Sequence, residues 1–470
     1  MEDPIGSLDE IKSNLITYLG TAFGTRFTSF ENERKHLLIK PGVLCQEPFI
    51  EPLPVYKSSG KKITEISEDP LPNLSGKQAK ELAELSSCGL LGDFELYVHQ
   101  VETLNKALKG KNCIIAAGTG SGKTEAFMLP LLAYLIKESE GWLPPGTPPL
   151  AWGDWWRNSD WQKQCGEAKS WRVPQRGHEK RSKAVRALLI YPMNALVEDQ
   201  LTRLRNALDS PAARAWLKKN RSGNLFYFAR YNSQTPVPGH EYIQKNGKSM
   251  PNWQKIKQLA DTLKEIEEIE ACASQVERGE NSDIRRFFPS LDGAEMRCRW
   301  DMQDSPPDIL ITNFSMLSVM LMREEDAPIF EKTREWLVSD PNHIFHLIID
   351  ELHLYRGTAG TEVAYLLRLL LYRLGLSPGH PQLRILASSA SLDPSDSGSL
   401  QFLQDFFGSK AESFEIIEGQ EILPENVAYK KPVPADPFIW IAESDLPIDH
   451  NTLKKAAAAL GQPHDSDSGE

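Results

Sequence analysis

Residues 113–127 read Cys-Ile-Ile-Ala-Ala-Gly-Thr-Gly-Ser-Gly-Lys-Thr-Glu-Ala-Phe, an apolar run followed by a glycine-rich turn and a Lys-Thr pair. The apolar run predicts a strand, and the residues after the pair are typical of a helix. Glycines in such a turn let backbone N–H groups point at phosphate oxygens, and the helix that follows adds the positive end of its dipole. The stretch therefore predicts a phosphate-binding loop of the form A-x-x-G-x-G-K-T, with Ala117 in its first position.

Each part of this loop has an expected role in binding a nucleotide. Lys123 would reach the β- and γ-phosphates of ATP, and the Thr124 hydroxyl would hold Mg²⁺. A glycine-rich turn without a ligand would not need the Lys-Thr pair between a strand and a helix in this order. We therefore expect ATP and Mg²⁺ as cofactors, with nucleotide contacts also from the remaining loop residues, which are Gly118, Thr119, Gly120, Ser121 and Gly122.

A second motif, further along the chain, reads Ile-Ile-Asp-Glu-Leu-His over residues 348–353. Its apolar strand would deliver two acids at the carboxyl end, where the phosphates of a bound nucleotide would lie. Asp350 is suited to hold Mg²⁺ partly through water, and Glu351 to orient and deprotonate the attacking water. Two acids that cap the following helix are the alternative, but the phosphate loop in the same chain favours the catalytic interpretation.

The composition is that of an ordinary soluble globular protein, with 40% hydrophobic and 25% charged residues among 470. A net charge of −11 argues against a generally basic nucleic-acid-binding coat but leaves room for a local basic groove. The six cysteines are scattered without a C-x-x-C pair, which argues against a zinc module and a disulfide framework. The amino terminus does not read as a signal peptide, so we expect a cytoplasmic protein without membrane contact.

The sequence pattern divides into three regions. Residues 1–75 form an expected N-terminal accessory region, and residues 401–470 a linker or the start of a following region that ends in a disordered tail. Between them, residues 76–400 alternate strand and helix, which is typical of an α/β domain with a mostly parallel sheet and helices on both faces. The expected strands are Cys113–Ala116, Ala187–Tyr191, Leu225–Tyr231, Asp308–Thr312, Phe345–Asp350 and Leu383–Ser388.

Two insertions interrupt this alternation, at about 138–184 and 250–290. The first is rich in tryptophan, arginine and lysine, so its rings could stack on single-stranded bases while its cations bind phosphates. It could equally pack as a lid on the core or dock a partner, and the sequence leaves these alternatives open. The second opens with an amphipathic helix, which we interpret as a packed, solvated insertion. The basic residues considered for the phosphates are Arg157, Lys163, Lys169, Arg172, Arg176, Lys180 and Arg181.

Further polar residues lie where strands end and helices begin. Gln100, shortly before the phosphate-loop strand, can pair with the edge of an adenine base, although it could simply begin a surface helix. Asn194 follows one strand, and Thr312 and Asn313 follow another. Helix starts of this kind can hold successive phosphates of one nucleic-acid strand, but ordinary N-capping explains each of them when it is considered alone. The hydroxyls of Ser389–Ser391 could hydrogen-bond the acidic motif and link the nucleotide state to domain contacts.

Taken in order, these motifs resemble the first RecA-like domain of a superfamily-2 DExH helicase. They are the glutamine motif, A-x-x-G-x-G-K-T, Y-P-M-N-A-L-V-E-D-Q, T-N-F-S-M-L, D-E-L-H and S-A-S. Three longer stretches begin at Arg230, Arg299 and Asp350 and read R-Y-N-S-Q-T-P, R-W-D-M-Q and D-E-L-H-L-Y-R-G-T-A-G. They resemble the RecQ-like branch of large bacterial helicases with a C-terminal zinc-binding module, which includes the helicase subunits of anti-phage systems such as Druantia and DISARM. The resemblance covers roughly residues 1–420.

This resemblance implies ATP hydrolysis coupled to movement on DNA in the 3′ to 5′ direction. It implies that Gln100 reads the adenine base. It also implies that three residues couple the ATP site to DNA, which are His353, Ser389 and Ser391. The implied nucleic-acid contacts are Asn194, Arg230, Thr312 and Asn313. DNA, as a single strand or a duplex end, is thus the expected partner.

The chain departs from this family in one important respect. Members complete their ATP site with a second RecA-like domain whose arginines reach the γ-phosphate, and no Q-x-x-G-R-x-G-R follows here. An arginine finger can contribute ~10³–10⁵ in rate, so this chain alone is expected to bind ATP but to hydrolyse it poorly. Either the chain is a fragment of a longer protein, or a partner such as a defence-system subunit supplies the second lobe. The remaining alternative is a non-catalytic subunit whose nucleotide state changes its contacts with nucleic acid or a partner.

Overall fold

The computed structural model describes residues 4–40, 42–45, 55–118, 120–166, 169–276, 284–393, 395–422, 436–442, 444 and 450–460. The chain divides into two units, Met1–Glu421 and Ile422–Glu470, and each is considered by itself. Thr119 of the phosphate loop and the tail predicted to be disordered, residues 462–470, lie outside the described residues.

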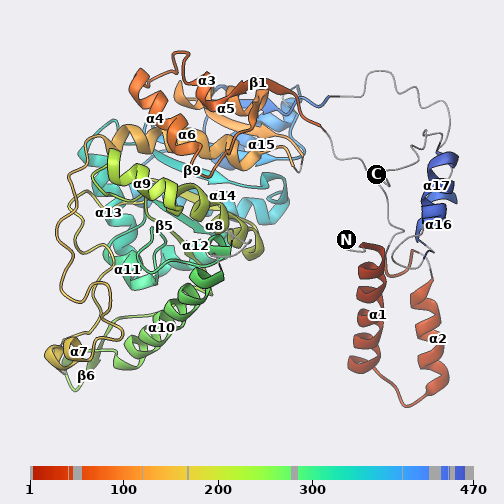
Figure 1. Cartoon of the computed structure of the whole chain (residues 1–470), viewed down its shortest axis with the longest axis horizontal. Coiled ribbons are helices and arrows are strands. Elements are labelled where there is room, and N and C mark those ends of the chain that lie inside the picture. The colour runs from red at the N-terminus through yellow and green to blue at the C-terminus, as the bar shows by residue number, and fades with distance from the viewer. Residues whose placement is uncertain are drawn as a thin grey trace. The chain divides into compact units, whose positions relative to one another are not determined.

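A seven-stranded sheet forms the centre of the first unit (Figure 1). Its strand order is β11-β3-β10-β9-β4-β8-β5, and the neighbouring strands pair in parallel. The six strands expected from the sequence all belong to it, whereas β11, which extends the sheet beyond residue 400, is not predicted. The strands are β3 (Asn112–Ala116), β4 (Ala187–Ile190), β5 (Phe228–Tyr231), β8 (Ile309–Thr312), β9 (Phe345–Ile349), β10 (Leu383–Ser389) and β11 (Phe414–Glu418).

Helices cover both faces of the sheet, and two separate hydrophobic clusters lie beneath them. Alternate residues of a strand point to opposite faces, so Cys113 and Ile115 of β3 pack into one cluster and Ile114 into the other. Burial on both sides explains why these strands read as uninterrupted apolar runs. The first cluster is completed by α4 (Gly76–Ser86), α5 (Val98–Leu108), α6 (Lys123–Ser139), α8 (Asn194–Asp209) and α9 (Pro211–Asn220), and the second by α12 (Phe314–Met322), α13 (Ala327–Ser339), α14 (Gly357–Leu374) and α15 (Ser397–Phe407). This is the RecA-like α/β fold of P-loop NTPases that the sequence predicts.

The two insertions share a third hydrophobic cluster. Trp155 and Trp156 of the first insertion are each 1% exposed and belong to the same cluster as the apolar side of α10 (Trp253–Val276). Nε1 of Trp156 also donates to Glu267 of that helix at 3.1 Å. Because a buried ring has no face left for a base, the structure favours packing over base stacking for these two tryptophans.

The other described elements are two small antiparallel pairs and several helices. β1 (Ser58–Lys62) pairs with β2 (Glu95–Tyr97), and β6 (Tyr242–Lys245) pairs with β7 (Lys248–Pro251). Among the residues that the structure describes, every helix is too short or too polar to span a lipid bilayer. The helices are α1 (Pro4–Ala22), α2 (Thr28–Ile39), α3 (Ile63–Ile66), α7 (Ser159–Cys165), α11 (Arg299–Asp304), α16 (Asp436–Ala442) and α17 (His450–Ala459), with 3₁₀ turns at η1 (Ile284–Phe287), η2 (Leu352–Leu354) and η3 (Ala411–Ser413).

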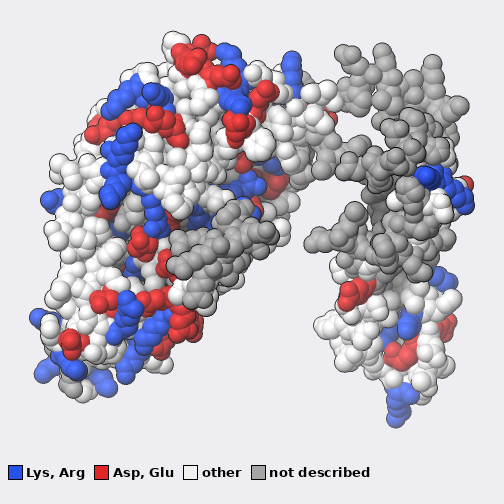
Figure 2. Space-filling view, in the orientation of Figure 1, with Lys and Arg blue, Asp and Glu red and all other residues white. Residues whose placement is uncertain are grey.

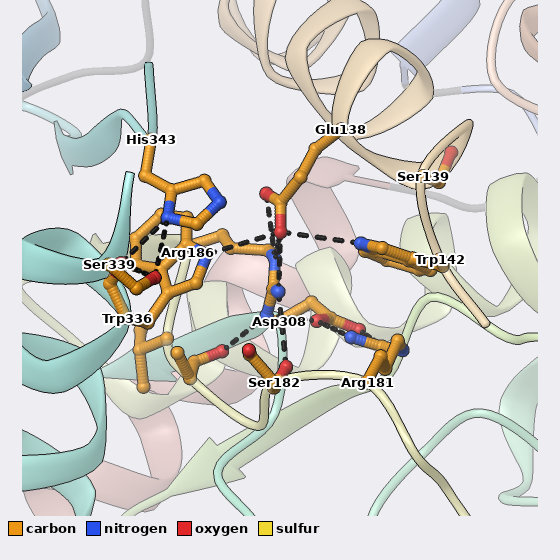
Figure 3. A network of polar contacts seen from close by, with 12 residues as sticks. Glu138, Ser139, Trp142, Arg181, Ser182, Arg186, Asp308, Trp336, Ser339 and His343 are labelled. Atoms are coloured by element: carbon orange, nitrogen blue, oxygen red, sulfur yellow. Dashed lines mark hydrogen bonds and ion pairs between the residues drawn. The ribbon is translucent and has the colours of Figure 1, made fainter. Parts of the chain in front are cut away.

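A network of buried charges lies at the amino-terminal edge of the sheet (Figure 3). Asp308, which precedes β8, is fully buried and accepts both Nη groups of Arg181 at 2.6 Å and Nη1 of Arg186 at 2.8 Å. Arg186 in turn pairs with Glu138 near the end of α6 at 2.6 Å, and this carboxylate also accepts two indole N–H groups. The network ties the first insertion to the sheet, so Arg181 holds the insertion in place and is not free to bind a phosphate.

We expect this network to make the protein sensitive to acid. Burial alone would raise the pKa of Asp308, but the charges of Arg181 and Arg186 more than offset it and lower the pKa to about 2. Because this pKa is lower in the folded protein than in the unfolded chain, the carboxylate contributes stability above about pH 4 that is lost as the pH falls toward about 2. The contribution is roughly 2–3 kcal/mol.

Asp308→Asn should therefore lower the free energy of unfolding at neutral pH by at least that amount, because it also leaves two buried arginines without their partner. It should also flatten the loss of stability between about pH 4 and pH 2. Urea unfolding at several pH values measures both effects, with the exposed Asp405→Asn as the matched control. An acid dependence that is the same in Asp308→Asn and in the unsubstituted protein would assign the effect to other carboxylates.

Candidate nucleotide site and nucleic-acid edge

The phosphate loop connects β3 to α6. Gly120 and Gly122 have φ angles of 75° and 70°, in the region that glycine adopts without strain. A Cβ atom on Gly122 would lie 2.3 Å from Nε2 of Gln100, so the glutamine would have to move. Ser121 is buried, and its hydroxyl donates to the carbonyl of Gly118 at 2.9 Å. The loop therefore has the curled backbone that a phosphate cradle needs.

The two acids of the second motif face this loop. Asp350 and Glu351 follow β9, and Oε1 of Glu351 lies 3.0 Å from Nζ of Lys123. Glu351 has a φ angle of 52°, which is unusual for a residue with a side chain, and backbone strain of this kind occurs often at functional sites. The structure thus brings together the ends of two strands that β10 separates in the sheet.

A neighbouring strand holds Asp350 in place. The hydroxyl of Ser388 in β10 donates to Asp350 and accepts the backbone N–H of Glu351 at 3.1 Å. Burial raises the pKa of Asp350 above its usual value, the hydrogen bond from Ser388 opposes this shift, and the charge of Glu351 adds to it. A cation beside the carboxylate would offset the cost of burying its charge. The Asp350 carboxylate and the Thr124 hydroxyl are hard oxygen ligands, so these residues fit Mg²⁺.

The imidazole of His353 lies between the acidic motif and the strand end of β10. Its Nδ1 is 3.2 Å from Oε2 of Glu351 and 3.4 Å from the backbone N of Ala390. Nδ1 cannot donate to the carboxylate and accept from the amide at the same time, so only one of these two contacts is made at any moment.

The two serines of the S-A-S motif have different surroundings. Ser389 ends β10, is fully buried, and accepts the backbone N–H of Ser391 at 3.3 Å. Ser391 is exposed, and its hydroxyl accepts Nη2 of Arg356 at 3.0 Å. In this structure Ser391 is therefore the one of the pair whose side chain can reach another domain or a nucleic acid.

Gln100 makes two contacts through its side-chain amide. Its Oε1 accepts the backbone N–H of Tyr97 at 2.9 Å, and its Nε2 donates to the carbonyl of Gly122 at 3.0 Å. Beside it, Nε2 of His99 lies 2.7 Å from the carbonyl of Ser121, and burial lowers the pKa of this imidazole. Two adjacent side chains of α5 therefore fix the phosphate loop, while the reading of adenine by Gln100 stays a prediction.

Several residues predicted to contact nucleic acid lie at the carboxyl edge of the sheet. Asn194 begins α8, and its Oδ1 accepts Nδ2 of Asn313 at 2.9 Å. Asn313 also caps α12, because its Oδ1 accepts the backbone N–H of Met316 at 2.8 Å. Arg230 in β5 pairs with Glu198 of α8. Asn313 therefore caps α12 and also lies beside Asn194.

Thr312 differs from Asn194, Arg230 and Asn313, which are partly exposed. It is fully buried, and its hydroxyl donates to the carbonyl of Tyr231 at 2.7 Å, so its side chain does not reach the surface. Sequence reasoning did not single out Asn232, which is also fully buried and whose Nδ2 lies 3.4 Å from Oδ1 of Asn194, so it supports Asn194 from inside the protein. The sequence does indicate Asn232, because it directly follows the strand of the R-Y-N-S-Q-T-P stretch. The neighbouring strands β4, β8 and β5 are followed by Asn194, Asn313 and Asn232, respectively.

Other residues that support the site were also missed. Tyr56 accepts the backbone N–H of Gly118 with its hydroxyl at 2.9 Å and packs edge-on against two neighbouring aromatic rings. No motif marks Tyr56, because its contact depends on a segment that precedes the predicted domain. Nε2 of Gln200 in α8 donates to Oγ1 of Thr124 at 3.3 Å. The signal for Gln200 was its position as the last residue of Y-P-M-N-A-L-V-E-D-Q.

The fold and these paired motifs define a class of protein. A RecA-like sheet carries a phosphate loop opposite two adjacent acids, and residues 97–225 match the DEAD/DEAH box helicase family. Over these residues the chain is similar to helicases of the DEAD/DEAH type.

Among known proteins, the chain is similar to Druantia protein DruE of Escherichia coli (strain UMEA 4076-1), with 30% identity over 461 residues. The match covers 91% of this chain and 22% of DruE, so the chain spans less than a quarter of the length of this relative.

Crystal structures of the DUF1998 helicase MrfA are also similar. The structure of MrfA bound to DNA shares 16% identity at a TM-score of 0.39, over 78% of this chain and 29% of MrfA. The structure bound to DNA and AMPPNP shares 14% identity at a TM-score of 0.40, over 87% of this chain and 40% of MrfA.

Proposed function

We propose that this chain is the N-terminal, ATP-binding half of a DNA helicase or translocase that acts in bacterial anti-phage defence. The observation that carries the proposal is the 3.0 Å contact between Lys123 and Glu351, because the phosphate-binding cation and the candidate base meet at one point. The helicase domain over residues 97–225 supports nucleotide use, and the similarity to DruE supports a defence system of the Druantia type.

In this proposal the residues of the chain divide the work of ATP hydrolysis. Loop amides and Lys123 would hold the phosphates, while Thr124 and Asp350 would hold Mg²⁺. Bound Mg²⁺ supplies positive charge beside the β- and γ-phosphates. Glu351 would orient the attacking water and accept its proton, and Gln100 would hold the adenine.

DNA would contact the carboxyl edge of the sheet through local contacts. The helix starts at Asn194 and Asn313 would offer N–H groups to successive phosphates of one strand. Arg230 would add a charge by exchanging its carboxylate partner for a phosphate. The net charge of the chain is −11, and on the face shown in Figure 2 basic and acidic side chains are interspersed. Local strand-end contacts rather than a general positive field would therefore hold the DNA. His353 and Ser391 would couple these contacts to the nucleotide.

We further propose that the chain alone hydrolyses ATP slowly. An arginine from a second RecA-like lobe would complete the site and can add ~10³–10⁵ in rate. A longer form of the protein or a defence-system partner would supply this lobe.

Phosphate release with and without single-stranded DNA tests the proposal, on this chain and on a longer product that carries a second lobe. We expect slow hydrolysis by the chain alone, and in the longer product a rate increase that depends on DNA and exceeds the increase with RNA of the same sequence. Fast DNA-stimulated hydrolysis by the chain alone would disprove the need for a second lobe. Nucleotide binding that changes DNA affinity without hydrolysis in either protein would instead support a non-catalytic subunit.

A further inference from the structure

Helix α8 joins the candidate nucleic-acid edge to the nucleotide site. It begins at Asn194, whose side chain bonds Asn313 at the carboxyl edge of the sheet. Gln200 lies about 9 Å further along the helix axis, at a rise of roughly 1.5 Å per residue. Its side chain is buried, at 5% exposure, and its Nε2 donates to Oγ1 of Thr124 at 3.3 Å. One helix therefore contacts both the predicted DNA surface and the predicted magnesium ligand.

The contact with Gln200 limits the directions in which the Thr124 hydroxyl can accept or donate. The hydroxyl oxygen has two lone pairs, and the amide N–H of Gln200 uses one of them. The other lone pair is then confined to the two remaining positions around the oxygen, one of which the hydroxyl proton takes. A residue that orients a metal ligand in this way typically contributes about 10–100-fold to metal affinity.

A second contact links α8 to α6. Arg203 pairs with Glu125, the residue after Thr124, at 2.7 Å and with Asp199 of its own helix at 3.0 Å. At the other end of α8, a phosphate bound at Asn194 would compete with Nδ2 of Asn313 for the helix start. A shift of the helix start would be carried along the helix to Gln200, because a packed helix moves as a unit.

We propose that Gln200 is a positioning residue, which sets the Thr124 hydroxyl for Mg²⁺ and couples DNA binding to nucleotide binding through α8. This inference rests on the proposed function, because it takes Thr124 as a magnesium ligand and Asn194 as a DNA contact. Coupling here means that DNA changes the affinity for the nucleotide and the nucleotide changes the affinity for DNA by the same factor.

The test measures binding rather than hydrolysis, in the full chain. A fluorescent, non-hydrolysable ATP analogue is titrated at several Mg²⁺ concentrations, with and without single-stranded DNA. In Gln200→Ala, the Mg²⁺ concentration for half-maximal analogue binding should rise by about 10-fold. The factor by which DNA changes the Kd of the analogue, expected to be roughly 5–150 in the unsubstituted chain, should be lost. The losses should be confined to the magnesium-dependent part of binding, which parallel titrations in a chelator define.

Two further variants control the experiment. Gln200→Asn keeps the amide but is one methylene shorter, so the polarity is unchanged while the contact with Thr124 is lost. It should show the same losses of magnesium affinity and of the DNA effect. It decides the outcome should Gln200→Ala fail to fold. Thr202→Ala alters the same helix at a hydroxyl that donates to the carbonyl of Glu198 at 3.1 Å, and it should change neither quantity. Circular dichroism and thermal unfolding verify that each variant is folded.

The outcomes separate this inference from the proposed function. If DNA has no effect on analogue binding in the unsubstituted chain, the coupling through α8 fails, whereas the proposed function is decided separately by DNA-dependent hydrolysis in the longer product. If that effect exists and survives in Gln200→Ala and Gln200→Asn, the coupling alone is overturned. An unchanged magnesium requirement in both variants overturns the positioning of Thr124.

Discussion

Glu351→Gln is expected to lower the rate of ATP hydrolysis by about 10²–10⁴-fold without weakening ATP binding. The amide of glutamine can still orient a water molecule, but it cannot accept the proton of that water. The ion pair adds a second effect. Because Glu351 lies 3.0 Å from Lys123, it competes with a phosphate for the ammonium group. Neutralising the acid removes this competitor, so ATP should bind at least as tightly as before.

Single-turnover hydrolysis with the protein in excess over labelled ATP measures the chemical step even when it is slow. A parallel titration with a non-hydrolysable analogue gives the affinity. The matched control is Glu362→Gln, which neutralises an exposed glutamate of α14 and should leave both quantities unchanged. A single-turnover rate in Glu351→Gln equal to that of the control would remove Glu351 from the chemical step.

The meeting of Lys123 and Glu351 could be anticipated from the sequence because both follow apolar strands. In a parallel sheet, all carboxyl ends lie at one edge, so residues after β3 and β9 are brought near each other whatever the length of the insertions between them. The same reasoning brings Asn194 and Asn313 together. This argument from strand ends does not depend on side-chain packing. The positions of the motifs along the sequence were therefore sufficient to predict that these residues lie close together.

Side-chain partners depend on register and packing, and these were harder to predict. In β10 the motif drew attention to Ser389, but Ser388 is the residue that bonds Asp350, because neighbouring residues of a strand face opposite sides. Arg181 reads as a phosphate ligand by its type, yet it pairs with Asp308 inside the protein. The edge strand β11 was missed because its short run, Phe-Glu-Ile-Ile-Glu, mixes acids with apolar residues, as edge strands often do.

Lys123→Ala should lower the affinity for ATP by roughly 100-fold, and the affinity for ADP by less. A hydrogen bond from a charged group contributes roughly 1.5–3 kcal/mol, which corresponds to about 10–150-fold in affinity. The ammonium would reach both the β- and the γ-phosphate, so ADP loses only part of this interaction. The variant also leaves Glu351 facing the phosphates without a neutralising partner, which adds repulsion. Titration calorimetry with ATP and with ADP measures both affinities.

The matched control is Lys137→Ala, at the other end of α6, where the ammonium donates to the carbonyl of Asn73 at 3.2 Å. It should bind both nucleotides as the unsubstituted chain does. The double variant Lys123→Ala/Glu351→Gln separates the two causes of the loss, because removing the acid also removes the repulsion. If it binds ATP more tightly than Lys123→Ala does, part of the role of the lysine is to neutralise Glu351, and the remaining loss is its direct contact with phosphate. Equal losses for ATP and ADP in Lys123→Ala would place the ammonium away from the γ-phosphate. The contact between Lys123 and Glu351, on which the catalytic interpretation depends, would then also lie away from the γ-phosphate.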